Sequence, residues 1–526
     1  MRKKTLFKKT AALSMAALLG LTAVPSSAFA ADTYAQAEEE VWGKMAEKLA
    51  ESISESFKKD SASLSETHGE LSLDLEDAGR SLLGLLVPFD VSWLKGASIS
   101  MDASMEENNS GTILKVLLNG SQICSMEIYI DPVNQIMYAK IPELSDKYMK
   151  ASLSDIEEEE VPEAEGNLND LFTIASAVAT SMPEASLQEE ILDRYGNMIF
   201  DSFDNEEEGS ETLTAGGVSQ DCTLYKGKIT SAAGVKAAED ILTSARSDEQ
   251  IKDILQNWEA QLPQNEGFYD KFQSDIDKGL DQLKEVQTSD SDAYLVSSLW
   301  VTEEGRVAGR DITLVNGQES TPVFTWKTTG NKEDRGLLLS LNSDDSNISL
   351  EGSGKVADGL LSGSYELTMD STPCAAIEVS DYNISSAKKG KIAGTYTVSP
   401  IASGEDDQSS SLENLALVLN LASEGDTSSI NLSVTSAGSS LGALSLSSSK
   451  GEKLQMPDLT SITDAYDMDN EQELQEYTST MDFNAIIDNL TQAGMPQEVL
   501  DSLLNGEEDE IPEAETDESG AENAAE

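Results

Sequence analysis

The sequence predicts an α+β fold in which a large, curved antiparallel sheet of half-barrel-like shape carries an N-terminal helix and a central helical block. Three observations predict it. Residues 111–153 contain three consecutive strand patterns joined by turn dipeptides, and residues 294–447 are almost entirely short alternating segments. Helical periodicity is confined mainly to residues 38–58 and 167–286. Two subdomains that meet near Ser289 are the alternative arrangement.

The first element is an amphipathic helix over residues 38–58. Its apolar residues recur at near-helical spacing and form one stripe, which favours packing on the sheet: Val41, Trp42, Met45, Leu49, Ile53 and Phe57. Two strand patterns follow, at residues 71–75 and 99–105. His68, the only histidine, stands between the helix and the first strand, and we expect it on a surface loop.

The central hairpin turns at Asn119-Gly120, a dipeptide that tolerates the positive φ values of a two-residue turn. Counting outward from this turn pairs Val116 with Ile123 and Leu114 with Ser125. Both faces of the hairpin are then apolar, so we expect cover on both sides, by helices, by more sheet or by a bound apolar molecule. The candidate cavity-facing residues are Leu114 and Val116 on one face and Met126 and Ile128 on the other.

Helical patterns dominate the middle of the chain and strands dominate its end. One stripe runs from Leu168 to Val178, another from Leu187 to Met198, and three helical segments follow a strand at residues 221–230. The late strands alternate leucine or isoleucine with serine, asparagine or threonine, which predicts one dry face and one wet face. Short helices are expected at residues 459–468 and 483–504.

The N-terminus has the three parts of a secretory signal peptide. Five basic residues precede an apolar run over residues 11–24, and Ala28-Phe29-Ala30 provides a small-residue cleavage site. We therefore expect cleavage after Ala30, a mixed domain over residues 31–505 and a disordered acidic tail over residues 506–526. The signal peptide predicts export, and no later stretch is long and apolar enough to cross a bilayer. The expected location is therefore extracytoplasmic, secreted or associated with the cell envelope.

The formal net charge of −61 makes nucleic acid an improbable partner, because such a field repels phosphate. The three cysteines are Cys124, Cys222 and Cys374, an odd number that leaves at least one unpaired in a monomer. Buried free thiols are favoured over a single Cys124–Cys222 bridge.

No constellation of catalytic residues is recognisable. One histidine cannot supply a His-based zinc site, and nucleophile-elbow, phosphate-loop and dinucleotide fingerprints are missing. Acidic residues 467, 469, 471 and 473 lack the glycine and the final glutamate of a calcium loop. The phrases at residues 157–165 and 507–515 are nearly identical acidic low-complexity segments. We therefore predict no enzyme activity, catalytic residue, cofactor or metal.

Three stretches resemble uncharacterised exported proteins of the broad LolA/LppX-like lipoprotein class: Met137–Tyr148, Tyr225–Thr230 and Val301–Val307. The resemblance spans residues 38–305. It implies a strongly curved antiparallel half-barrel that holds helices against its concave side, with an apolar cavity between them. This chain is longer than that class and has no lipidation cysteine at the cleavage site.

These features give a leading function and two alternatives. The leading expectation is a secreted, noncatalytic binding protein for an apolar or lipid-like ligand. A cell-surface structural or protein-interaction protein without a small-molecule ligand is the first alternative. The second is an acid-based hydrolase, which would need two carboxylates close together in a cleft.

Overall fold

The computed structural model describes residues 31–63, 66–85, 90–105, 109–131, 134–152, 182–261, 267–285, 293–343, 346–387, 391–401 and 414–505. The expected signal peptide, the acidic tail, both acidic phrases, the stripe from Leu168 to Val178 and Ser289 lie outside these residues.

One open sheet of twenty strands forms most of the described molecule. Its strands are β1 (Glu66–Leu75), β2 (Gly96–Met105), β3 (Ser110–Leu118), β4 (Ser121–Asp131), β5 (Ile136–Lys140), β6 (Met149–Ser152), β7 (Asp204–Ala215), β8 (Val218–Thr230), β9 (Tyr294–Val301), β10 (Val307–Asn316), β11 (Glu319–Gly330), β12 (Asp334–Asn342), β13 (Asn347–Ala357), β14 (Leu360–Met369), β15 (Thr372–Asn383), β16 (Gly394–Pro400), β17 (Leu415–Glu424), β18 (Thr427–Ser436), β19 (Ser439–Lys450) and β20 (Tyr466–Asp467).

The α-helices are α2 (Tyr34–Ser63), α3 (Asp77–Leu83), α5 (Ala185–Phe200), α6 (Ser231–Arg246), α7 (Glu249–Gln261), α8 (Phe268–Glu285), α9 (Ile384–Ala387), α10 (Glu471–Thr478), α11 (Asn484–Gln492) and α12 (Gln497–Asn505). The predicted α+β class, with a large antiparallel sheet, an N-terminal helix and a central helical block, is confirmed. A single 3₁₀ turn and the short strand β20 replace most of the helix expected at residues 459–468.

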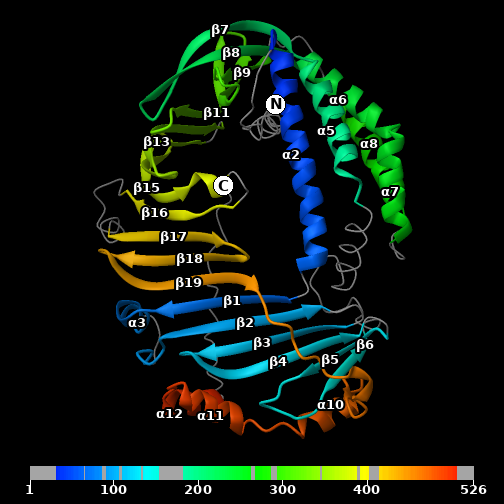
Figure 1. The fold of residues 1–526 in the computed structure, drawn as a ribbon, viewed down its shortest axis with the longest axis vertical. Coiled ribbons are helices and arrows are strands. Elements are labelled where there is room, and N and C mark those ends of the chain that lie inside the picture. The colour runs from blue at the N-terminus through cyan, green and yellow to red at the C-terminus, as the bar shows by residue number, and fades with distance from the viewer. Residues whose placement is uncertain are drawn as a thin grey trace, which may run out of the picture.

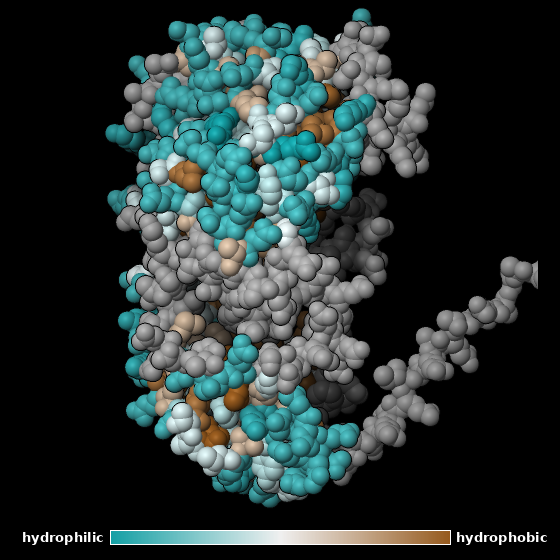
Figure 2. Space-filling model, turned by 90° about the vertical axis from the view of Figure 1, so that its right-hand side faces the viewer, coloured by the Kyte–Doolittle hydropathy of each residue, from teal (hydrophilic) through white to brown (hydrophobic). Residues whose placement is uncertain are grey.

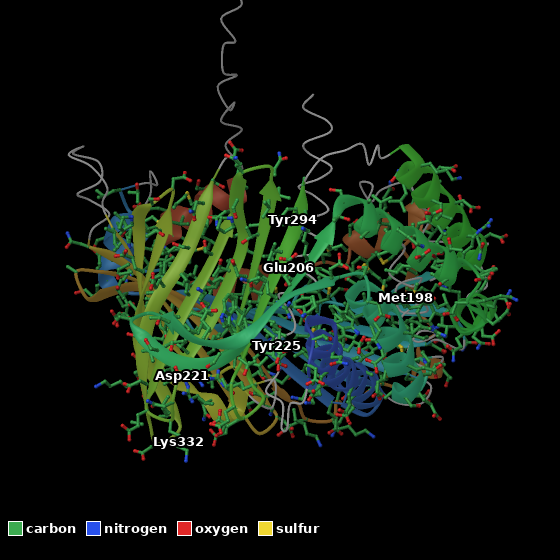
Figure 3. The ribbon with its side chains drawn as sticks, turned by 90° about the horizontal axis from the view of Figure 1, so that it is seen from above. Met198, Glu206, Asp221, Tyr225, Tyr294 and Lys332 are labelled. Atoms are coloured by element: carbon green, nitrogen blue, oxygen red, sulfur yellow. The ribbon has the colours of Figure 1, made fainter. Side chains whose placement is uncertain are left out.

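The sheet consists of two meanders. Strands β1 to β6 form one and strands β7 to β19 form the other, and the pairing of β1 with β19 joins them. All pairings are antiparallel except the short parallel contact of β20 with β6. In Figure 1 the strands β1 to β4 run across the page, whereas in Figure 3, seen from above, the strands near Tyr294, where β9 begins, run up the page, which is the viewing direction of Figure 1. The sheet is therefore strongly twisted over its length.

Helix α2 packs against strands β8, β9 and β10 through a buried core. Tyr34, Val41, Tyr225 and Leu299 belong to one cluster, and Trp42 packs with Phe200 and Ile312 in a second. Glycine at position 196 is required, because a Cβ atom there would lie 2.0 Å from the indole Nε1 of Trp42. The apolar stripe predicted for this helix is thus buried at Val41 and Trp42, while Leu49 remains 42% exposed.

The β7–β8 hairpin folds back over the sheet. Thr329 Oγ1 donates a 2.7 Å hydrogen bond to the carbonyl of Val218, and the side chain of Gln220 accepts one from the backbone of Gly330 at 3.0 Å. Figure 3 shows the hairpin crossing the neighbouring strands between Glu206 and Asp221. The hairpin covers one face of β11 to β13, and the sheet stays open.

The central hairpin contains a β-bulge that the turn did not predict. Asn119 and Gly120 have φ values of 52° and 81°, as a two-residue turn requires. Leu117 pairs with Gln122 as expected, but Val116 pairs with Cys124 and Leu114 with Met126. The predicted pairing beyond Leu117 is therefore wrong by one residue, because Ile123 is the extra residue of the bulge.

Candidate functional site on the leucine face of the sheet

Residue pairing defines two chemically different faces of the sheet. We call the leucine face the one that includes Ile312, which contacts Trp42 of helix α2. Ladder partners share a face, so it can be followed strand by strand. One row of partners crosses seven strands: Leu421, Ile430, Leu446, Leu71, Ile99, Val116 and Cys124. The other side is the serine face, which presents Ser445, Ser447, Glu70 and Asp102.

The leucine face exposes most of the large apolar side chains found at the surface. Sixteen of the twenty-three exposed large apolar residues in the described ranges lie on it, with exposures of 37–52%. We call these sixteen the leucine strip: Leu71, Leu73, Ile99, Met101, Met105, Val116, Met126, Leu339, Leu341, Ile348, Met369, Leu417, Ile430, Leu432, Leu444 and Leu446. Scattered apolar residues are normal on protein surfaces, but a continuous patch of this kind marks a site of interaction.

Acidic residues are excluded from this face over twelve adjacent strands. Between β12 and β4, no aspartate or glutamate occupies a leucine-face register position in the described residues. Arg335 and Lys450, near strand ends, are its charged residues. The whole chain has 96 acidic residues, so this segregation is pronounced. Where Figure 2 draws described residues, the outer surface is mainly hydrophilic, and hydrophobic side chains appear in small groups.

The leucine strip is long and narrow. Its members lie on ten of the twelve strands from β12 to β4, with none on β15 or β16, and at a spacing of about 4.8 Å these twelve strands span roughly 50 Å. Helix α2 packs on β7 and β8 and reaches Arg310 and Ile312 on β10, at one end of this face. The strip is therefore an extended surface rather than a deep closed pocket.

The structure places all four candidate cavity-facing residues on the leucine face. The bulge at Ile123 brings Met126 and Ile128 to the same face as Leu114 and Val116. Val116 and Met126 are 39% and 37% exposed, and the other two are partly buried. The pairing predicted from the turn had placed Met126 and Ile128 on the opposite face, and that placement is wrong.

The prediction of cover on both sides of this hairpin is confirmed for the serine face and wrong for the leucine face, where Val116 and Met126 remain exposed. Ile123 and Tyr129 are buried there, and Asn489 of helix α11 donates a 2.9 Å hydrogen bond to the carbonyl of Ile123. Tyr129 joins a cluster with Tyr138 and Leu459. Cover is thus present on the serine face, and the leucine face keeps its exposed residues.

Sequence patterns predicted the apolar face of individual strands, but they did not predict that these strands lie side by side and form one surface. The alternating leucines of β17 to β19 predicted a dry face, and so did those of β1. Their combination depends on the pairing of β1 with β19, for example Leu71 with Leu446. Residues so distant in sequence gave no local signal of this contact.

A fully buried ion pair fixes helix α2 to the sheet. Arg310 and Glu38 are 1% and 0% exposed, and they form two hydrogen bonds, one of 2.7 Å between Nη2 and Oε2. Burial raises the pKa of the nearby Tyr34 phenol, and the Glu38 carboxylate raises it further. Such a pair positions a helix, because neither charge is tolerated there without its partner.

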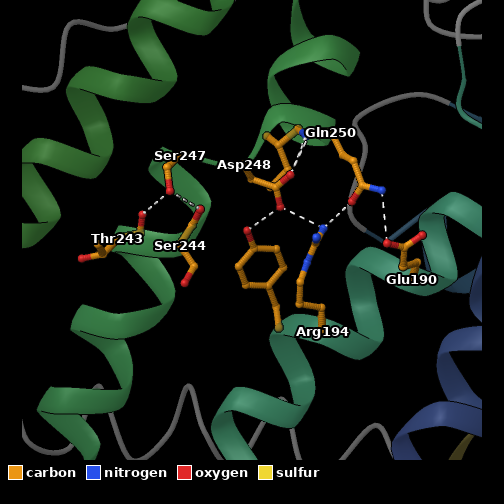
Figure 4. Close-up of polar contacts among 9 residues, drawn as sticks. Glu190, Arg194, Thr243, Ser244, Ser247, Asp248 and Gln250 are labelled. Carbon is orange, nitrogen blue, oxygen red and sulfur yellow. Dashed lines mark hydrogen bonds and ion pairs between the residues drawn. The ribbon is translucent and has the colours of Figure 1, made fainter.

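A second polar cluster joins helices α5 and α7 (Figure 4). Asp248 accepts hydrogen bonds from the Tyr195 hydroxyl at 2.7 Å and from two backbone amides at the start of α7, and it pairs with Arg194 at 2.9 Å. Burial and the bond to Asp248 raise the pKa of Tyr195 to about 12. This carboxylate has a structural role, as the cap of a helix.

His68 lies within strand β1, so its expected position on a loop is wrong. Pairing of β1 with both β2 and β19 extends the strand to Glu66. His68 Nδ1 lies 2.7 Å from Asp102, and Lys115 Nζ lies 2.8 Å from the same carboxylate. Burial raises the pKa of Asp102, but the hydrogen bonds from Lys115 and His68 outweigh burial and hold it below its usual value.

The described residues show no group of three or more histidine, cysteine, aspartate or glutamate side chains that could hold a metal ion. The carboxylates of Asp467 and Glu473 instead accept hydrogen bonds from nearby backbone amides. Glu473 accepts one of 2.8 Å from Asp467, and Asp467 accepts one of 3.1 Å from Asp469. All three cysteines are free, as favoured from the sequence, and burial raises the pKa of Cys222 to about 11.

None of the described helices is both long enough and apolar enough to cross a membrane. Comparisons with protein-family models, curated proteins and solved structures found no match.

Proposed function

We propose that this chain is a noncatalytic, extracytoplasmic binding protein that holds a long apolar or lipid-like ligand on the leucine strip. One observation carries the proposal: sixteen large apolar side chains remain 37–52% exposed on a single face. The signal-peptide pattern supports a location outside the cytoplasmic membrane.

The apolar area of the strip is sufficient for binding. Burying a large aliphatic side chain completely contributes about 1.5–3 kcal/mol, so covering the exposed part of each strip residue contributes roughly 0.6–1.2 kcal/mol. Sixteen such contributions give a gross term of roughly 10–20 kcal/mol, against an association cost of about 4–15 kcal/mol. At mid-range values a ligand that covered the strip would gain a net of roughly 5 kcal/mol, which corresponds to a dissociation constant on the order of 0.1 mM.

The composition of the strip favours an acyl chain over a protein partner. The sixteen residues are eight leucines, four methionines, three isoleucines and one valine. Protein interfaces take most of their binding energy from tryptophan, tyrosine and arginine. None of these is among the sixteen, and the tyrosines of the leucine face lie on β14 to β16, apart from the seven adjacent strands β17 to β4 that carry twelve of the sixteen. A hydrocarbon chain needs only an aliphatic surface of this kind. The strip, at roughly 50 Å, exceeds the roughly 15 Å depth of one bilayer leaflet and could hold several chains.

The role of an interaction protein is the second candidate, favoured by the openness of the strip. An exposed apolar face can bind an amphipathic segment of another protein as well as a lipid. This candidate predicts that purified protein binds no small apolar probe at saturable stoichiometry.

A charge placed on the strip tests the proposal. Leu446 and Ser447 are neighbours in β19 that face opposite sides of the sheet. We expect Leu446→Glu to weaken binding of the uncharged fluorescent probe 1-N-phenylnaphthylamine at least tenfold, because it places a carboxylate in the strip. Ser447→Glu is the matched control and should leave binding unchanged, and circular dichroism should show that both variants fold. Equal binding by both variants and by the unsubstituted protein would contradict the proposal.

A further inference from the structure

Three tyrosines interrupt the aliphatic surface near the middle of the leucine face. Tyr365 on β14 pairs with Gly352 and Ile377, Tyr382 on β15 pairs with Leu361, and Tyr396 on β16 pairs with Val379. Because these partners belong to the leucine-face register, the three tyrosines occupy the same face on three adjacent strands.

Glycines beside the tyrosines leave room for their rings. A Cβ atom at Gly352 would lie 2.7 Å from Cδ1 of Tyr365, so this ring lies directly against the backbone of β13. A Cβ atom at Gly394 would lie 2.9 Å from the Cα atom of Tyr382. Gly352 therefore lets the Tyr365 ring lie close to the sheet, and Gly394 lets the backbones of β15 and β16 approach closely beside Tyr382.

Among the residues that the structure describes, none accepts a hydrogen bond from the three hydroxyl groups, and the three oxygens are not among the buried, unpartnered polar atoms. The hydroxyls are therefore accessible to a ligand that lies on this face. Burial raises the pKa of Tyr365, and burial together with the neighbouring Tyr382 and Tyr365 raises the pKa of Tyr396. Both phenols are therefore neutral near pH 7 and able to donate a hydrogen bond.

We propose that Tyr365, Tyr382 and Tyr396 donate hydrogen bonds to an uncharged acceptor group of the ligand, the carbonyl of a long-chain ester or amide. The inference rests on the proposed function, since it assumes that the leucine strip holds the chains of the same ligand. Phenol donors recognise carbonyl oxygens without requiring charge. Of the two cations on this face, Lys450 lies on β19, away from the tyrosines, and Arg335 lies on β12, two strands from Tyr365. The tyrosines thus provide three neutral donors beside one cation.

Two probes of similar length separate the inference from the proposed function. Methyl decanoate contains an ester and dodecane does not, and both can compete with 1-N-phenylnaphthylamine for the full-length mature protein. Each neutral hydrogen bond contributes about 1 kcal/mol, so removing the hydroxyls should weaken binding of the ester roughly fivefold for each bond lost and leave binding of dodecane unchanged.

The triple variant Tyr365→Phe, Tyr382→Phe, Tyr396→Phe keeps the rings and removes the hydroxyls. We expect it to bind methyl decanoate more weakly by that factor and to bind dodecane as the unsubstituted protein does. Tyr269→Phe on helix α8 is the control and should bind both compounds as the unsubstituted protein does. A triple variant whose ester binding is unchanged, or whose binding of both compounds falls equally, would overturn the inference alone. If neither compound binds, the proposed function fails and the inference fails with it.

Discussion

Removing one member of the buried Glu38–Arg310 pair should release helix α2 from the sheet. Glu38→Gln leaves the Arg310 guanidinium, 1% exposed, without its counter-charge. Breaking a buried pair in this way costs about 3–5 kcal/mol. We therefore expect Glu38→Gln to destabilise the docked helix by that amount.

Hydrogen–deuterium exchange of peptides from helix α2 is the suitable assay, because it reports local opening rather than global unfolding. A loss of about 3–5 kcal/mol corresponds to exchange that is roughly two to four orders of magnitude faster. Replacing both partners, as in Glu38→Leu with Arg310→Met, should restore much of the protection, because well-packed apolar residues can substitute for a buried pair.

An exposed ion pair provides the control for this prediction. Lys236 and Asp240 on helix α6 form a 2.6 Å contact with side chains that are 70% and 50% exposed. Asp240→Asn should change local stability by less than about 1 kcal/mol. If Glu38→Gln accelerated exchange no more than Asp240→Asn does, the buried pair would not be what fixes helix α2.

Three further predictions concern processing, pH and thiol chemistry. N-terminal sequencing of the exported protein should give Ala31 first, because Ala30 ends the predicted signal peptide; a different first residue would refute the assigned cleavage site. Asp102→Asn should lower the free energy of unfolding at pH values above the ordinary aspartate pKa. The loss relative to the unsubstituted protein should disappear as pH falls through the lowered pKa of Asp102 in the folded state. Denaturant unfolding at several pH values checks this, and a loss that grows on acidification would contradict it. Cys222, with its pKa raised to about 11, should react with iodoacetamide at pH 8 far more slowly than a free thiol such as glutathione, as followed by mass spectrometry; equal rates would show that the thiol is not buried.

Local chemistry was enough to predict the fold class and the first turn of the central hairpin. Asn119-Gly120 specified the turn and the pairing of Leu117 with Gln122. The turn could not specify the bulge at Ile123, because a bulge depends on which residues the neighbouring strands and helices bury. A signal was nevertheless present. Bringing the alternating apolar residues of both strands to one face requires a shift of one residue.

Strands with polar sequences were harder to predict. The strand β7 is rich in glutamate and has few apolar residues, so it shows no apolar alternation, yet it pairs with β8 along its length. His68 similarly belongs to β1 because two neighbouring strands extend the ladder. In both cases tertiary pairing outweighs weak local preference.

The candidate site was predicted in part for a related reason. Each strand of the leucine strip carries a visible alternation, so the sequence identified a dry face. The extent of the strip depends on the β1–β19 pairing, which joins residues such as Leu73 and Leu444 across most of the chain. Contacts over that distance follow from the whole fold rather than from any local motif.

Native mass spectrometry of the mature protein purified from its native host, followed by organic extraction, tests the central claim most directly. The proposed function predicts a stoichiometric apolar adduct that extraction removes and that is lost in Leu446→Glu but retained in Ser447→Glu. A protein that carries no adduct, and that binds no uncharged long-chain compound when one is added, would contradict the claim. The leucine strip would then be assigned to contact with another protein.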